Sequence, residues 1–134
     1  MDTSETYIKM CDKAGEIQAQ REAIIGNFYY DPLTGVRIVG TIDSDGVNPF
    51  TIFNKQLEDS RYIWLPRQDQ LQDMVGESNP LDLVARLASE VSPFGVLDDP
   101  YWHPFTSMEQ LWLAFLLAEK YGKYWDGSDW VLKR

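Results

Sequence analysis

Cysteine and histidine are nearly missing from this chain of 134 residues, in which each occurs once, as Cys11 and His103. One cysteine excludes an intrachain disulfide, a cysteine-ligated zinc site and a cysteine-rich scaffold, since each needs further thiols. Basic residues are also few, because 12 lysines and arginines stand against 21 acidic residues, for a net charge of −9. General nucleic-acid binding is therefore not expected, since it depends on clustered cations that displace counterions from the phosphates.

Long hydrophobic runs are missing as well. The longest spans residues 111–118, whereas a transmembrane helix needs about 20 apolar residues. The first five residues, MDTSE, are polar and acidic, unlike the basic start and apolar stretch of a signal peptide. A lone cysteine suits a reducing compartment, and the negative charge disfavours contact with anionic membranes. We therefore expect a soluble, cytoplasmic protein with no membrane partner.

What the sequence does contain is apolar and aromatic side chains, at 44% and 13% of the residues. That content is too high for intrinsic disorder. A chain of this length can bury a core without disulfides or metals, and no repeat or linker divides it. The sequence predicts a single domain over residues 1–134, of the α+β class.

The first element is predicted to be an N-terminal helix over residues 4 to about 24. Apolar side chains recur there at spacings of three and four, which places them on one face of a helix. The stripe comprises Tyr7, Met10, Cys11, Ala14 and Ile17. Cys11 is accordingly interpreted as a small buried hydrophobe and not as a reactive thiol, which would need exposure and a nearby cation.

Residues 28–65 predict a small antiparallel meander of three or four strands. The segment is rich in β-branched and aromatic residues, which favour strands, and its short apolar runs are separated by turn sequences. Two turns are indicated, at residues 31–35 (DPLTG) and 43–46 (DSDG). Proline fixes φ and glycine permits positive φ, as tight turns require.

Three helices are predicted to follow, over residues 66–76, 80–91 and 107–121. In the second, Asn79 is the expected N-cap, with Pro80 in the first turn. Its buried face is predicted to comprise Leu81, Val84, Leu87, Ala88 and Val91.

The third helix matches the capping-box pattern, with Thr106 as cap and Glu109 three residues later. It is apolar nearly all round, which predicts burial on more than one side. The tail that follows is aromatic, and Asp126-Gly127 in it indicates a turn that returns a short strand.

Catalytic and ligand-binding candidates are few. Asp98, Asp99 and His103 form the single cluster of histidine with carboxylates, and His103 could act there as a general base. A structural loop is the competing interpretation of this segment. Glycine-rich phosphate loops and complete metal-ligand sets do not occur, so no cofactor and no metal are expected.

Two further groups are candidates for binding. Arg67 stands at the start of a predicted helix, where it could hold a carboxylate or phosphate or simply solvate the helix. Nine of the 18 aromatic residues lie in residues 101–134, and Tyr124, Trp125 and Trp130 follow the last predicted helix. Surface aromatics mark binding patches, whereas a tail that folds back would bury them.

Three stretches carry a resemblance to a known group of proteins: residues 7–14 (YIKMCDKA), 63–72 (IWLPRQDQLQ) and 108–131 (MEQLWLAFLLAEKYGKYWDGSDWV). They resemble small uncharacterised proteins encoded by phages and prophages of Firmicutes. The resemblance implies a phage-related protein in the cytoplasm of a bacterial host, and it implies no reaction and no functional residues.

The leading hypothesis is a non-enzymatic accessory protein that binds a host or phage protein. A DNA mimic is a weaker variant, because its acidic charge would have to be dense and here it is scattered. One alternative is a small hydrolase or metal-dependent enzyme that uses Asp98, Asp99 and His103. Another is a self-associating structural or packaging component, which would be a homo-oligomer.

Overall fold

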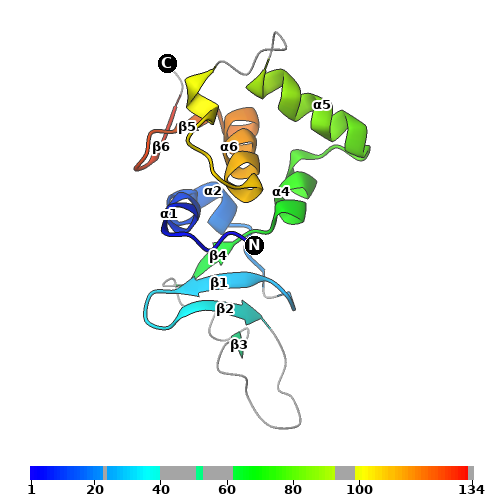
Figure 1. The fold of residues 1–134 in the computed structure, drawn as a ribbon. Helices are drawn as coiled ribbons and strands as arrows, with labels where there is room; N and C mark the ends of the chain where they lie inside the picture. Colours follow the sequence, from blue (N-terminus) through cyan, green and yellow to red (C-terminus); the bar gives the residue numbers. More distant parts are fainter. Residues whose placement is uncertain (23, 40–50, 53–61, 93–98, 133–134) are drawn as a thin grey trace. The chain divides into compact units, whose positions relative to one another are not determined.

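The computed structural model describes residues 1–22, 24–39, 51–52, 62–92 and 99–132 (Figure 1). The chain forms two compact units. The N-terminal unit is Thr3–Arg67, and the C-terminal unit is Gln68–Arg134 together with Met1 and Asp2. Helices combine with a small sheet in the first unit and with a two-stranded sheet in the second. The α+β class is therefore confirmed.

The N-terminal unit begins with α1 (Glu5–Lys13) and α2 (Gly15–Gln18). The Oγ of Ser4 caps α1 by accepting a hydrogen bond from the amide of Tyr7, at 3.2 Å. Every residue of the expected apolar stripe is fully buried, Cys11 included. The single helix expected to residue 24 is wrong, however. The helix breaks at Ala14, directly before a glycine, and glycine destabilises a helix because it loses the most conformational entropy on folding. Helical structure ends at Gln18.

The sheet of this unit comprises β1 (Phe28–Asp31), β2 (Gly35–Val39), β3 (Thr51–Ile52) and β4 (Ile63–Leu65). Its strand order is β3-β2-β1-β4. β1 pairs antiparallel with β2 and with β4, as an antiparallel sheet requires, whereas β2 and β3 are parallel. The topology therefore differs from a simple meander.

The first predicted turn is present between β1 and β2. The carboxylate of Asp31 accepts hydrogen bonds from the amide of Leu33 at 3.0 Å and from the hydroxyl of Thr34 at 2.8 Å. Gly35 has a φ of +93°, which a side chain would oppose. The second predicted turn, at residues 43–46, lies outside the described residues.

β4 ends the sheet, and a side chain covers its outer edge. Nε2 of Gln18 donates to the carbonyl oxygen of Trp64 at 2.9 Å, and the amide of Trp64 donates to Oε1 of Gln18 at 2.9 Å. The same Nε2 donates to the carbonyl of Cys11 at 3.1 Å. The side-chain amide of Gln18 thus pairs with the backbone of Trp64 as a neighbouring strand would. Without it, the edge of β4 would leave these backbone groups without a partner.

The C-terminal unit contains α4 (Gln68–Val75), α5 (Pro80–Val91), the 3₁₀ helix η1 (Pro100–Trp102) and α6 (Met108–Tyr121). The three α-helices match the predicted ranges to within two residues at each end. α4 packs against α6, whose central residues are buried all round, as its sequence predicts: Gln110, Trp112, Leu113, Ala114, Phe115, Leu116 and Leu117.

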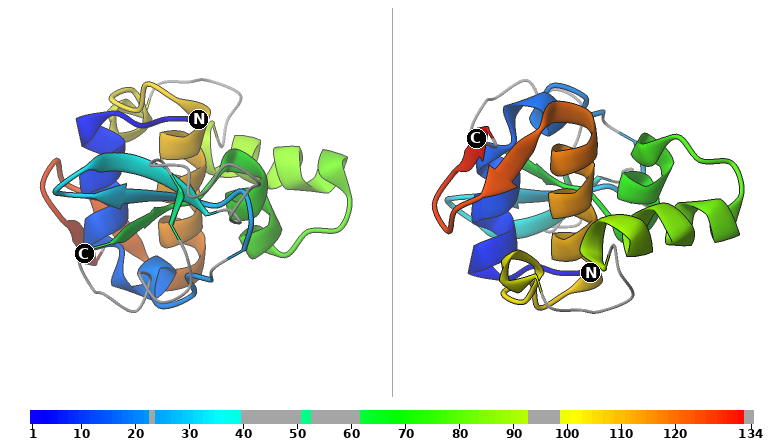
Figure 2. Two further views of the ribbon diagram at one scale, coloured as in Figure 1. Left: turned by 90° about the horizontal axis from the view of Figure 1, so that it is seen from below. Right: turned by 90° about the horizontal axis from the view of Figure 1, so that it is seen from above.

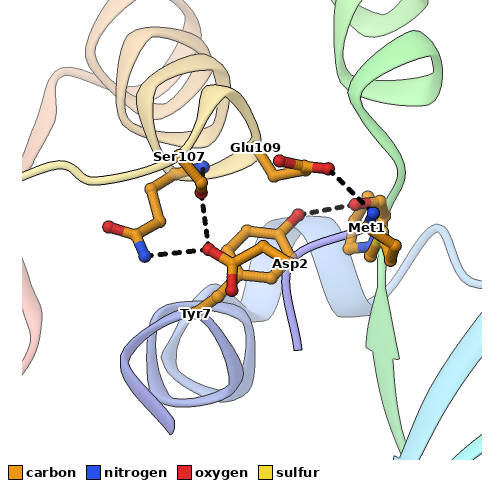
Figure 3. A network of polar contacts seen from close by, with 7 residues as sticks. Met1, Asp2, Tyr7, Ser107 and Glu109 are labelled. Atoms are coloured by element: carbon orange, nitrogen blue, oxygen red, sulfur yellow. Dashed lines mark hydrogen bonds and ion pairs between the residues drawn. The ribbon is translucent and has the colours of Figure 1, made fainter. Parts of the chain in front are cut away.

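The cap of α6 differs from the expected one. Oγ of Ser107, and not of Thr106, accepts the hydrogen bond from the amide of Gln110, at 3.1 Å. Asp2 fixes this choice, because its carboxylate accepts hydrogen bonds from the hydroxyl of Ser107 and from Nε2 of Gln110 (Figure 3). Glu109, expected to complete a capping box, instead lies 3.8 Å from the amino group of Met1.

The aromatic tail forms a hairpin. β5 (Lys123–Trp125) and β6 (Trp130–Leu132) are antiparallel, and β5 packs against α6, as the right-hand view of Figure 2 shows. The carboxylate of Asp126 accepts hydrogen bonds from the amides of Ser128 and Asp129, both at 2.8 Å. The predicted turn at Asp126-Gly127 and the returning strand are therefore confirmed.

Candidate functional site

The loop of Asp98, Asp99 and His103 is described only in part, because Asp98 lies outside the described residues. Oδ1 of Asp99 accepts a hydrogen bond from the amide of Tyr101, at 3.0 Å, and so caps η1. His103 is exposed at the other end of η1, where its amide donates to the carbonyl of Pro100 at 3.3 Å. Both side chains line one pocket. The structural role expected of this loop is thus present, and the catalytic role stays a prediction.

Arg67 uses its guanidinium within the N-terminal unit. Nη1 donates to the carbonyl oxygen of Gly26 at 3.0 Å and to Oδ1 of Asn27 at 3.3 Å. These acceptors are neutral, and they tie the end of the β4 segment to the residues just before β1. The contacts describe a structural arginine, while its binding of an anion stays a prediction.

The three candidate aromatics of the tail differ in their burial. Trp130 is buried, whereas Tyr124 and Trp125 are half-buried. Trp125 and Trp130 face each other across the hairpin with ring centroids 5.1 Å apart. The tail therefore folds back, but of these three side chains only that of Trp130 is buried.

Tyr101 fastens this hairpin to η1. Its hydroxyl oxygen accepts a hydrogen bond from the amide of Trp125 at 2.9 Å, and its ring meets that of Tyr124 edge-on at 5.2 Å. Burial raises the pKa of Tyr101 to about 12. The hydrogen bond and the ring contact make Tyr101 an anchor for β5.

A pocket of about 370 Å³ lies beside η1 and the start of α6. Its apolar lining comes from α5, η1, the loop after it and α6: Val91, Trp102, Phe105, Met108 and Leu111. Four polar residues complete it: Asp99, His103, Thr106 and Ser107. A mainly apolar pocket with a few polar groups is the usual composition of a binding site. Sequence reasoning found the two acid–base residues of its lining and missed the apolar part.

The largest departure from the sequence-based expectation is on α5. Leu81 and Val84, predicted to be buried, are 79% and 58% exposed. Ala88 is exposed as well, whereas Leu87 and Val91 are half-buried. The prediction of a buried face was wrong, because Leu83, on another side of the helix, is the residue that is buried.

The side of α5 that turns inward also carries a polar anchor. Nη1 of Arg86 donates to the carbonyl of Val75 at 3.3 Å and to Glu77 at 2.9 Å, and its Nη2 donates to Glu119 of α6 at 2.6 Å. At 100° per residue, Arg86 and Leu83 lie on one side of the helix and Val84 lies on the other. The hydrogen bonds of Arg86 therefore hold α5 on the side that also carries Leu83.

The outward side of α5 is uncharged. We define the α5 face as Leu81, Val84, Ala85, Ala88 and Val91, which fall within about a third of the helix circumference. Val91 also lines the pocket, so the α5 face and the pocket share a residue and form one apolar surface. A run of exposed apolar residues that ends in a pocket is typical of an interaction site. The missed signal was the presence of two apolar stripes on this helix.

None of the protein-family models, curated proteins or solved structures compared with this chain matches it. Within the described residues, no three or more histidine, cysteine or acidic side chains gather as a metal site would require. A search of the same residues finds no helix with the length and apolar character needed to cross a membrane.

Proposed function

We propose that this protein is a non-enzymatic interaction module, which binds another protein through the α5 face and the adjoining pocket. The observation that supports this proposal is the exposure of Leu81 and Val84, at 79% and 58%. Burying an aliphatic side chain stabilises an association by about 1.5–3 kcal/mol. A helix that leaves such side chains in water, while its charged arginine turns inward, has apolar area available for a partner.

The biological setting is a second part of the proposal. The three stretches at residues 7–14, 63–72 and 108–131 resemble phage and prophage proteins, and from this we infer an accessory protein in the cytoplasm of a bacterial host. The partner is then a host or phage protein. The half-buried Tyr124 and Trp125 offer a further contact area on the same unit.

Affinity capture with matched variants tests the proposal. The bait variant Leu81→Gln/Val84→Gln removes apolar area from the α5 face without changing the charge. The control is Leu33→Gln/Ile38→Gln, because Leu33 and Ile38 are also exposed, at 76% and 41%, but belong to the N-terminal unit. We expect the wild type and the control to retain one and the same protein from a lysate of the host, and the α5 variant to lose it. Retention that is equal for all three baits would contradict the proposal.

A small hydrolase is the second candidate function. The observation that favours it is that Asp99 and His103 line the same pocket, which is where an acid–base pair would act on a substrate. A panel of ester and phosphoester substrates, with and without added divalent metal, provides the assay. Hydrolysis that disappears in His103→Ala would support it, and equal rates for wild type and His103→Ala would exclude it.

A further inference from the structure

We infer that the partner of the α5 face presents an amphipathic α-helix, with a basic flank and one bulky apolar side chain that enters the pocket. This inference deepens the proposed function and rests on it. Three features of the C-terminal unit support it: the helical spacing of the exposed residues, the size and lining of the pocket, and the charge around α5.

The spacing favours a helical partner. Leu81, Val84, Ala88 and Val91 stand at i, i+3, i+7 and i+10, which forms a ridge along the helix about 15 Å long. Ala85 and Ala88 are small, so a second helix can approach this ridge closely. Helices that dock in this way place their own apolar residues at i, i+3 or i+4 and i+7, the same repeat that the α5 face presents.

The pocket favours one large anchor. Its volume of about 370 Å³ lies within the range of about 300–1,000 Å³ that is usual for small-molecule sites, and it exceeds what a methyl or hydroxyl group would fill. Because Val91 belongs both to the α5 face and to the pocket, a helix that lies along the face can direct a side chain into it. Large anchors, mainly aromatic, dominate the binding energy of many interfaces.

The charge favours a basic partner over a second copy of this chain. Asp82 is exposed and lies next to the α5 face, whereas Glu90 and Arg86 with its two carboxylate partners lie on the other side of the helix. The pocket adds Asp99. This region is therefore net negative, in a chain of net charge −9. A second copy would bring like charges together, whereas lysines and arginines beside an apolar helix face would be attracted.

Selection from two peptide libraries tests the inference. One library presents helix-stabilised peptides and the other presents extended, proline-containing peptides of equal length, and both are selected against the intact chain. We expect binders from the helical library, with an apolar i, i+3, i+7 pattern, an excess of lysine and arginine, and one aromatic residue. Binding of a selected peptide, measured by fluorescence anisotropy, should weaken at least tenfold in Leu81→Gln/Val84→Gln and should be unchanged in Leu33→Gln/Ile38→Gln.

The charge is tested with the same peptide. Its affinity should fall severalfold for Asp82→Asn, and it should fall as the salt concentration rises from about 0.05 M to about 0.5 M, because exposed charges are screened. All substituted positions except Asp82 are apolar and exposed, and Asp82 is exposed too, so we expect the melting temperatures of the variants to stay near that of the wild type.

Several outcomes would overturn the inference. Binders that map to the α5 face but are extended or acidic would contradict the helical, basic partner and would leave the proposed function standing. Binders with equal affinity for the two double variants would contradict both the inference and the proposed function. The absence of any binder from either library would do the same. Light scattering that shows a wild-type dimer and a monomeric Leu81→Gln/Val84→Gln variant would assign the α5 face to a second copy instead.

Discussion

Replacement of Gln18 by alanine is expected to lower the free energy of unfolding by about 2–4 kcal/mol. The side chain takes part in three hydrogen bonds, two with the backbone of Trp64 and one with the carbonyl of Cys11. Each such bond contributes about 1 kcal/mol net, and a buried group that loses its partner costs about 1–3 kcal/mol. Trp64 and Cys11 are buried, so water cannot fully replace the lost amide.

Matched variants make this prediction sharp. Gln20 lies two residues further on, and its Nε2 donates at 3.1 Å to Glu16 in an exposed bond. Gln20→Ala should therefore cost less than about 0.5 kcal/mol. Gln18→Glu should cost at least as much as Gln18→Ala, because it places a carboxylate oxygen against the two carbonyl oxygens that now accept from Nε2.

Urea-induced unfolding followed by tryptophan fluorescence measures these differences, with unchanged m-values as the check that the same surface is exposed. The reasoning would be refuted by a Gln18→Ala variant as stable as Gln20→Ala. That result would mean that β4 needs no partner on its outer edge.

Three further outcomes are expected. Ser107→Ala should lower the unfolding free energy by about 1 kcal/mol, and Thr106→Ala by less than half of that, because Ser107 is the cap of α6; equal costs would contradict this assignment. Arg86→Ala should speed amide exchange in α5 with little change in α6, measured by hydrogen–deuterium exchange, since its guanidinium anchors α5; unchanged rates in α5 would show that Arg86 is no anchor. Burial raises the pKa of Tyr29 from 10.0 to about 12, so the neutral phenol is favoured in the folded state. Its contribution to stability is complete below pH ~10 and is lost between about pH 10 and 12, at about 1.4 kcal/mol per pH unit. Urea unfolding over that interval should show a shallower decline for Tyr29→Phe, and a parallel decline would contradict the shift.

Secondary structure could largely be predicted from local signals. Both ends of the helix over residues 80–91 were predicted correctly, because Asn79 and Pro80 are a helix start signal and Ser92-Pro93 is a stop signal. Such signals act through neighbouring residues in the sequence. Gly122 has a φ of +64° at the end of α6, where glycine carries little strain. Such features depend on neighbours in sequence, so they can be predicted without knowledge of distant contacts.

The cap of α6 and the pairing of the strands could not be predicted in the same way. Thr106 and Ser107 are adjacent hydroxyl residues that can both cap a helix, and the hydroxyl that does so also contacts Asp2, about a hundred positions away in sequence. The parallel pairing of β3 with β2 depends on the path of the chain between them, which composition does not define. The expectation of a single domain stays a prediction.

The candidate site shows the same division. From the sequence alone came the chemistry that is excluded by one histidine and one cysteine, the cap of α5, the buried Cys11 and the returning hairpin with Trp125 and Trp130. Beside the five residues of the α5 face, the sequence carries a second, shorter apolar stripe of Leu83 and Leu87, and periodicity alone does not say which stripe is buried. Only the tertiary structure selected between them: Leu83 is buried, and Arg86 reaches Glu77 and Glu119 from the same side. That choice leaves Leu81 and Val84 in water where the sequence predicted a core, and it is the reason that we propose an interaction surface there.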